Sequence, residues 1–221
     1  MKLLFSALIK FIIGLLLVGA LLFVPAGTLE YINGWIFIWL LFIPIFVLGV
    51  VLFFKAPDLL KKRLDGKENE KTQKGVVALS GLCFLSGFIV AGLDHRFGWT
   101  YIPLWGVIIA SVVLLTSYCL YAEVMRENAY LSRKIEIQKD QKIIDSGLYG
   151  IVRHPMYAVT IWLFLSIPIV LGSWWSLLCF LPYIPIIIVR IINEEKVLES
   201  GLEGYFEYKK RVKYRIIPFI W

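Results

Sequence analysis

The chain has 221 residues, 59% of them hydrophobic, with 23 Lys and Arg against 16 Asp and Glu. This apolar content lies outside the range of ordinary soluble domains, and the length leaves no room for a separate soluble catalytic module. The net charge of +7 is distributed between long apolar runs, which makes it a signal of membrane topology. We therefore predict a single membrane domain over residues 1–221 and no nucleic-acid partner.

Apolar runs long enough to cross about 30 Å of hydrocarbon recur along the chain. We predict six membrane spans, at residues 3–24, 35–54, 76–92, 101–121, 155–171 and 174–189. Only Gly172 and Ser173 separate the last two spans, which predicts a helical hairpin through the membrane. The predicted fold class is all-α, a polytopic helical bundle. Its N-terminal spans occupy residues 1–122 and its chemistry-bearing part occupies residues 123–221.

The placement of Lys and Arg predicts the orientation of these spans. With the N-terminus inside, the inner segments contain every Lys and Arg except Lys10 and Arg96. Lys10 lies in the first span, close enough to its end for the ammonium group to reach the boundary. Both termini and all long polar segments are therefore predicted to be cytoplasmic.

The first candidate site is the stretch 147–157, GLYGIVRHPMY, whose two glycines permit a tight turn. Proline suits the first turn of a helix and disfavours helix at the residue before it. His154 should therefore lie just before the fifth span, with Pro155 opening it. The N–H groups at that helix start, together with Arg153, favour an anionic group. A plain membrane-entry signal is an equally good interpretation of the same residues.

The second candidate site is the stretch 190–198, RIINEEKVL, at the end of the sixth span. Arg190 and Glu194 lie four residues apart, so they share a helix face and can pair. A solvated helix end with that ion pair is the simpler interpretation. Glu194 and Glu195 at a membrane boundary, however, need compensating cations or solvent. The hairpin places them near the Arg-His pair of the first candidate site, which predicts a polar pocket next to lipid.

A C-terminal surface helix is predicted from apolar positions at roughly helical spacing. These positions are Leu198, Leu202, Tyr205, Tyr208 and Val212. The helix is interpreted either as an interfacial anchor or as a lid that offers aromatic surface to a planar ring. The three cysteines each lie inside an apolar run and none forms a CxxC pair, so we predict neither a disulfide framework nor a metal site.

Four short motifs follow one another within residues 140–221. They are Gly147-x-Tyr149 with Arg153-His154-Pro155-x-Tyr157, then Arg190-x3-Glu194-Glu195-x2-Leu198, then Tyr205-x2-Tyr208, then Arg215-x-Ile217-Pro218. Together they resemble the isoprenylcysteine carboxyl methyltransferase family, which is related to the membrane phospholipid methyltransferases. The family pattern often continues His-Pro-x-Tyr-x-Gly, whereas this chain has Val159, which implies a differently shaped pocket.

The resemblance implies a membrane methyltransferase that uses S-adenosylmethionine and acts on a lipophilic acceptor. It implies cofactor-binding roles for Tyr149, Arg153, His154, Pro155, Tyr157, Glu194 and Glu195. By the same carry-over, Arg190 and Glu194 are catalytic, and Arg190, Tyr205 and Tyr208 bind the acceptor. Replacing Glu195 by alanine is expected to abolish cofactor binding in a folded protein.

The resemblance implies O-methylation of a carboxylate, whereas the residues themselves leave open a prenylated cysteine, a phospholipid head group, a quinone-like lipid or a small hydrophobic acid as the acceptor. A carboxylate acceptor is already nucleophilic, and Arg190 could orient it by a bidentate bond. An amine or alcohol acceptor would need His154 or a glutamate as a base.

Two other functions stay open. Some membrane sterol reductases have a similar C-terminal pattern, and an oxidoreductase of that kind would grip a phosphate of NADPH with the basic residues 209–211. A non-catalytic transporter or scaffold is the third possibility, although the spans lack the buried charges and broken helices of a transport pathway. A Rossmann-like methyltransferase is disfavoured, because the sequence has neither a G-x-G-x-x-G motif nor strand–helix alternation.

Overall fold

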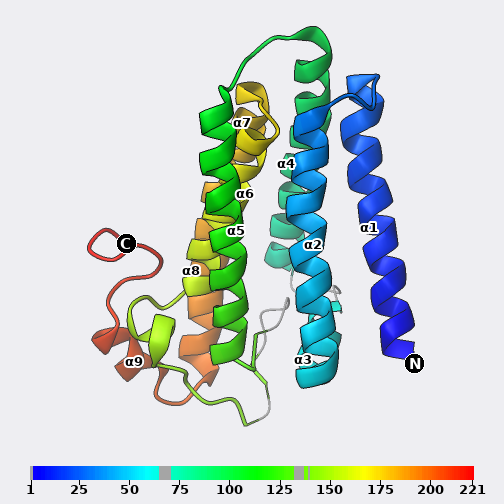
Figure 1. The fold of residues 1–221 in the computed structure, drawn as a ribbon. Coiled ribbons are helices and arrows are strands. Elements are labelled where there is room, and N and C mark those ends of the chain that lie inside the picture. Colours follow the sequence, from blue (N-terminus) through cyan, green and yellow to red (C-terminus); the bar gives the residue numbers. More distant parts are fainter. Residues whose placement is uncertain (1, 65–70, 132–136, 139) are drawn as a thin grey trace.

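The computed structural model describes residues 2–64, 71–131, 137–138 and 140–221. Within these residues it contains nine α-helices and one 3-10 turn. They are α1 (Lys2–Ala26), α2 (Ile32–Lys55), α3 (Pro57–Leu64), α4 (Lys71–Phe97), α5 (Leu104–Glu127), η1 (Gly147–Gly150), α6 (Pro155–Val170), α7 (Trp174–Phe180), α8 (Tyr183–Gly201) and α9 (Tyr205–Arg211). The predicted all-α bundle is confirmed (Figure 1).

Five segments of the described chain are long and apolar enough to cross a membrane, with mean hydropathies of 1.9 to 3.0. They are α1, α2, α4, α5 and the combined segment of α7 and α8. The remaining apolar helix, α6, has 16 residues, and at about 1.5 Å per residue it is about 24 Å long. The chain is thus a multi-pass membrane protein, and α6 is the short one among the six predicted spans.

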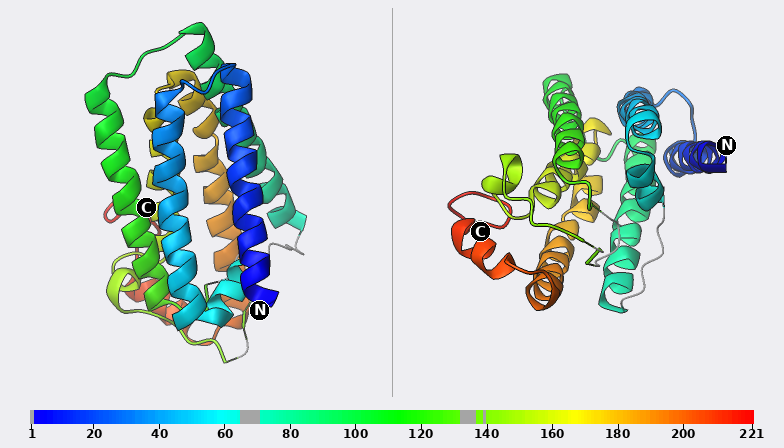
Figure 2. Two further views of the ribbon diagram at one scale, coloured as in Figure 1. Left: turned by 45° about the vertical axis from the view of Figure 1, so that its right-hand side comes forward. Right: turned by 90° about the horizontal axis from the view of Figure 1, so that it is seen from below.

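The predicted hairpin is formed by α6 and the segment of α7 and α8, which runs back beside it (Figures 1 and 2). Its turn is fixed by Ser173, whose hydroxyl accepts a hydrogen bond from Ser176 N at 3.0 Å and so caps α7. The hairpin returns the chain to the end of the bundle that contains α3, η1 and α9, which we call the α9 end. The opposite end is the α7 end.

At the α7 end, Asp94 connects three parts of the chain. Its side chain is 2% exposed and accepts hydrogen bonds from Thr100 N at 2.7 Å, from Thr100 Oγ1 at 2.5 Å and from Ser173 Oγ. A buried carboxylate is tolerated there because three donors replace its hydration. The helix α4 itself continues to Phe97, five residues beyond the predicted end of the third span at residue 92.

At the α9 end, the short helix α3 lies below α2 and was not predicted (Figure 1). Leu59 and Leu60 of α3 are buried against the bundle. Lys10 Nζ of α1 donates to Leu64 O at 2.5 Å, and Lys62 Nζ donates to Gln138 Oε1 at 2.5 Å. Lys10 thus reaches the end of the bundle as predicted, and there it holds the last carbonyl of α3.

The predicted surface helix over residues 198–212 is interrupted. Its first part is the end of α8, and the chain then turns through Gly204 at a φ of +78° before α9 begins. Spacing alone does not reveal this break, which glycine permits because it has no Cβ. Tyr205 and Tyr208 are buried against Ile143 and the end of α8. The apolar stripe therefore covers protein, which favours the lid interpretation over the interfacial anchor.

Candidate functional site

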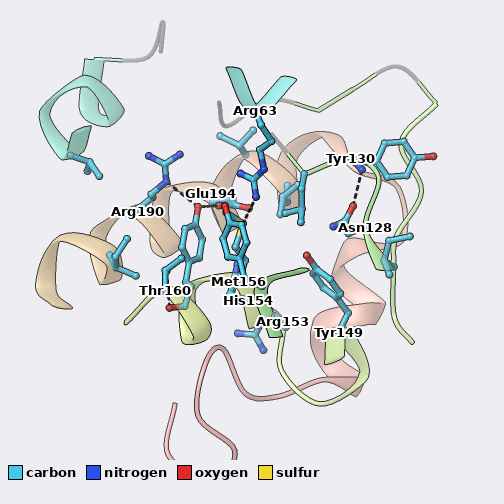
Figure 3. A pocket seen from close by; sticks show the side chains of 18 of the residues that line it. Arg63, Asn128, Tyr130, Tyr149, Arg153, His154, Met156, Thr160, Arg190 and Glu194 are labelled. Carbon is cyan, nitrogen blue, oxygen red and sulfur yellow. Dashed lines mark hydrogen bonds between the residues drawn. The ribbon is translucent and has the colours of Figure 1, made fainter. Parts of the chain in front are cut away.

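A pocket of about 480 Å³ opens at the α9 end of the bundle (Figure 3). Its size lies in the range of small-molecule sites, about 300–1,000 Å³. Side chains from α3, α4, α5, α6, α8, α9, η1 and the segment after α5 line it. The predicted site residues that line it are Tyr149, Arg153, His154, Tyr157, Arg190, Glu194, Tyr205 and Tyr208.

The approach to α6 is shaped by a glycine and a proline, as predicted. Gly147 has a φ of +56°, and a Cβ there would lie 1.8 Å from Glu127 Oε1. The Glu127 carboxylate instead accepts from Leu148 N, at 3.0 and 3.2 Å for its two oxygens. His154 is the N-cap residue of α6 and Pro155 is its first residue. The motif thus gives the chain a tight turn directly before a membrane helix.

A hydrogen-bonded chain of three residues joins α6 to α8 on the wall of the pocket. Tyr157 donates its hydroxyl hydrogen to Glu194 Oε2 at 2.5 Å and accepts from Arg190 Nε at 3.0 Å. Arg190 and Glu194 share a helix face, as predicted, and the tyrosine hydroxyl lies between them. This Arg190–Tyr157–Glu194 chain fixes the orientation of a carboxylate and a guanidinium at the pocket surface.

Glu195, the neighbouring carboxylate, lies away from the pocket and is 3% exposed. Its Oε1 accepts from Arg153 Nε at 2.8 Å and lies 3.3 Å from His154 Nε2, and its Oε2 accepts from Arg215 Nε at 2.9 Å. The predicted proximity of the Arg-His pair and the two glutamates is therefore confirmed. Neither Glu195 nor Pro155 is among the described residues that line the pocket.

Arg153 ties the C-terminal segment to the hairpin. Its Nη1 donates to Val212 O at 2.6 Å and to Lys213 O at 2.8 Å. In the backbone, Arg153 N donates to Tyr214 O at 2.9 Å, and His154 N donates to Arg215 O at 2.8 Å. The tail of the chain thus bonds to the N–H groups of the two residues that precede Pro155, the first residue of α6.

Three tyrosines form the aromatic side of the pocket. Tyr208 donates its hydroxyl hydrogen to Tyr149 O at 2.8 Å, and the ring centroids of Tyr205 and Tyr208 lie 5.8 Å apart. Burial raises the pKa of the hydroxyls of Tyr149, Tyr205 and Tyr208, so all three are neutral at physiological pH. They offer apolar ring faces with polar tips, the combination that suits a planar heterocycle.

Behind Tyr149, Val159 takes the position at which the family pattern often has glycine. Its side chain is 7% exposed and packs in one cluster with Val124 of α5 and Tyr149. The valine thus fills the contact between α5 and α6 and supports the ring that borders the pocket.

Arg63 of α3 enters the pocket, although sequence reasoning did not select it. In Figure 3 it projects between Arg190 and Glu194 on one side and Asn128 and Tyr149 on the other. Its Nε is buried without a hydrogen-bond partner. The sequence signal was hidden, because Arg63 belongs to a basic stretch that serves as a topology signal and because α3 was not predicted.

The Tyr205 hydroxyl is likewise buried without a partner. In the part of the chain that the structure describes, it and Arg63 Nε are the two buried side-chain polar atoms in this condition, and both residues line the same pocket. Each such atom costs about 1–3 kcal/mol unless a ligand satisfies it. Further lining residues that the sequence analysis missed are Asn128, Tyr130, Ser80, Gly81 and Phe84.

The basic residues 209–211, which the reductase interpretation requires, are engaged in ion pairs. Lys209 pairs with Glu199, Lys210 Nζ lies 3.1 Å from Glu207 Oε1, and Arg211 Nη2 lies 2.6 Å from Asp145 Oδ2. Since carboxylates already neutralise them, these residues give no support to a phosphate-gripping cluster.

The family model of phospholipid methyltransferases matches residues 102–203. The comparison with curated proteins gave no match. The matched segment includes α5, η1, the hairpin and the whole Arg190–Tyr157–Glu194 chain, whereas α3 and α9 lie outside it. The methyltransferase family predicted from the motifs is thereby confirmed. Residues 102–203 are therefore similar to the phospholipid methyltransferase family, which includes the isoprenylcysteine carboxyl methyltransferases.

Proposed function

We propose that this membrane protein transfers a methyl group from S-adenosylmethionine to the carboxylate of a lipophilic acceptor, at the cytoplasmic face. The observation that carries the proposal is the position of the Arg190–Tyr157–Glu194 chain. It lies within the residues that match a methyltransferase family and on the wall of a pocket between membrane helices. Apolar residues of α4 line the same pocket, so an acceptor with a hydrocarbon chain has a place to lie.

The residues of the pocket fit the cofactor. When bound, S-adenosylmethionine supplies an activated methyl group on a sulfonium sulfur, so the protein needs no nucleophile of its own. Glu194 would face the cationic part of the cofactor, because its carboxylate is held in place by Tyr157. The rings of Tyr149, Tyr205 and Tyr208 would contact the adenine. His154 would hydrogen-bond the amino-acid end.

Arg190 is the residue proposed to orient the acceptor. A guanidinium binds both oxygens of a carboxylate in a fixed geometry, which aligns one oxygen for in-line attack. A carboxylate is nucleophilic without deprotonation, so no general base is required. The residues of the pocket have to align the acceptor and exclude water, and such alignment contributes up to about 7–11 kcal/mol in well-oriented systems.

In this proposal, Arg153, Pro155 and Glu195 position other residues of the pocket. Arg153 and Glu195 hold the tail against the start of α6, and the tail segment carries Tyr205 and Tyr208. Pro155 sets the first turn of α6, from which Tyr157 projects.

The test is calorimetric titration of the purified protein with S-adenosylhomocysteine, with NADPH titrated in parallel. Micromolar binding of S-adenosylhomocysteine, with no binding of NADPH, is the expected result. Binding of NADPH alone would replace the proposal by a reductase function. Binding of neither by a folded protein would leave a transporter or scaffold.

A further inference from the structure

Arg63 has no role in the proposed mechanism. It also lies outside residues 102–203, the segment that matches the family model, because α3 precedes that segment. Its Nη2 donates to Met156 Sδ at 3.4 Å, and its Nε is buried without a partner. A thioether is a weak acceptor. No ion pair among the described residues includes Arg63, whose guanidinium carbon otherwise lies 5.4 Å from the ring centroid of Tyr121. Among the described residues, the partners of the Arg63 cation are thus the Met156 sulfur and the Tyr121 ring.

The edge formed by Nε and Nη2 is the one with which a guanidinium binds two oxygens side by side. In Arg63 this edge holds only the Met156 sulfur. Methionine is unbranched and flexible, so it vacates such a position easily. The geometry is that of an oxyanion site covered by a displaceable side chain.

The helix that carries Arg63 is held rigidly enough to serve as a binding element. Lys10 holds its last carbonyl, Lys62 holds Gln138, and two buried leucines anchor it to the bundle. Because Arg63 already projects into the pocket, little ordering has to accompany binding.

An apolar surface continues from this point along α4. Val76, Gly81 and Phe84 of that helix line the pocket, together with Phe164 of α6 and Tyr183 of α8. The ring centroids of Phe84 and Phe164 lie 4.6 Å apart, and those of Phe164 and Tyr183 lie 4.8 Å apart. These three packed rings close the end of the apolar surface that is farther along α4. At about 1.5 Å per residue, the stretch from Val76 to Phe84 is about 12 Å long. We call this surface the α4 groove.

We propose that Arg63 positions the acceptor. Its Nε–Nη2 edge displaces the Met156 sulfur and binds the carboxylate or phosphate oxygens of an anionic amphiphile, while the hydrocarbon chain lies in the α4 groove. Arg63 and Arg190, which line the same pocket, then share the anionic group, and Arg190 orients the oxygen that accepts the methyl group. The acceptor class is therefore an anionic lipid or lipid-like acid. The inference rests on the proposed function in assigning this ligand to methyl transfer, but the binding itself is measurable without turnover.

The first experiment measures the binding of decanoate, decyl phosphate and the neutral decanol by calorimetry. The full-length protein is held in nanodiscs of zwitterionic lipid, and empty nanodiscs are subtracted. Arg63→Gln should weaken binding of the anionic probes by about tenfold or more and leave decanol unchanged. Lys61→Gln is the control, because it removes the same charge from an exposed position of α3 that does not line the pocket.

A second pair of variants tests the α4 groove. A Cβ added at Gly81 meets no atom within 4 Å, and Gly81 lines the pocket, so Gly81→Leu should fill the groove and weaken binding of both anionic probes. Gly75 also has open space around its Cβ position but does not line the pocket, so Gly75→Leu should bind as wild type. If Gly81→Leu binds decanoate as tightly as Gly75→Leu does, the groove assignment is wrong.

Titration with S-adenosylhomocysteine separates this inference from the proposed function. Arg63→Gln should bind it within about twofold of wild type, and a large loss would mean that Arg63 holds the cofactor. Equal binding of decanoate by wild type and Arg63→Gln would also overturn the inference. Should Arg63→Gln fail to fold, Arg63→Lys takes its place, because it keeps the charge and loses the side-on edge. The two proposals can also fail separately. If Arg63→Gln loses affinity for decanoate but the wild-type protein binds no S-adenosylhomocysteine, the oxyanion site is upheld and the methyltransferase proposal is overturned.

Discussion

Arg153 and Glu195, which lie on the two arms of the membrane hairpin at its open end, form an ion pair of 2.8 Å between Nε and Oε1, and their side chains are 3% and 4% exposed. The same arginine donates to two carbonyls of the tail. One side chain thus connects α6, α8 and the segment that follows α9. Because a buried charge is costly without its partner, replacing either residue alone should destabilise the protein.

Glu195→Ala should destabilise the protein strongly, since it leaves Arg153 buried without a carboxylate. This expectation replaces the one drawn from the motifs, that the variant stays folded and loses only cofactor binding. Losing one partner of a buried ion pair costs about 3–5 kcal/mol. The measurement is the thermal unfolding midpoint of the detergent-purified protein. Glu199→Ala is the matched control on the same helix, because Glu199 pairs with Lys209 near the surface and such pairs contribute about 0–1 kcal/mol. Equal midpoints for the two variants would contradict the structural role of Glu195.

Tyr157→Phe should reduce catalysis while preserving the fold. The variant removes the hydroxyl that joins Arg190 to Glu194, and a hydrogen bond to a charged group contributes about 1.5–3 kcal/mol. We expect kcat/KM to fall by roughly tenfold to a hundredfold, measured as transfer of labelled methyl to a lipophilic carboxylate. Tyr101→Phe, an exposed tyrosine near the α7 end, should have wild-type activity.

Gly147→Ala should disrupt the turn before α6. The added Cβ would meet the Glu127 carboxylate at 1.8 Å, and the φ of +56° is unfavourable for alanine by about 1–2 kcal/mol. A lower unfolding midpoint and weaker binding of S-adenosylhomocysteine are expected. Gly49→Ala, inside α2 with open space around it, should be neutral or slightly stabilising. If the double variant Gly147→Ala/Glu127→Ala recovers part of the loss, the clash with Glu127 is its cause.

Asp94→Ala should separate stability from ligand binding. Removing this carboxylate leaves the donors of Thr100 and Ser173 unsatisfied, at about 1–3 kcal/mol for each buried group. The unfolding midpoint should fall, whereas the affinity for S-adenosylhomocysteine should stay at the wild-type value because Asp94 lies at the opposite end of the bundle. Glu30→Ala, at an exposed position between α1 and α2, serves as the control for charge.

The predicted orientation is open to chemical labelling. In a variant without the three native cysteines, Lys142→Cys should react with a membrane-impermeant maleimide only after lysis, because the α9 end is expected to be cytoplasmic. Glu30→Cys should react in intact cells. Both positions are exposed. The reverse pattern would place the pocket on the outer face.

The spans and the start of α6 were predictable because they follow from local properties, namely apolar length and the conformational limits of proline. The choice between Glu194 and Glu195 was not predictable to the same degree. Adjacent residues of a helix point about 100° apart, so one of them had to face the pocket and the other the interior. The sequence alone does not give the rotation of α8, which depends on how it packs against α6 and the tail.

Arg63 and the broken tail helix show the same limitation at longer range. The contact of Lys10 with Leu64 joins α1 to α3, and Tyr205 packs against Ile143 of a distant loop. Such contacts carry no periodicity, because they depend on the assembled bundle. Gly204 is present in the sequence, but the sequence alone does not show that it adopts a positive φ. That conformation depends on the packing of the apolar residues before and after it.

The tail bonds to Arg153 and His154 also bear on the order of biosynthesis. A nascent chain that has just inserted its membrane helices has not yet placed Tyr205, Tyr208 and the carbonyls that bond to Arg153 and His154. The pocket is thus completed only when the tail, which is synthesised after the hairpin, binds back against the residues before α6. A chain with every span inserted therefore still lacks the aromatic side of the pocket until its tail has bound.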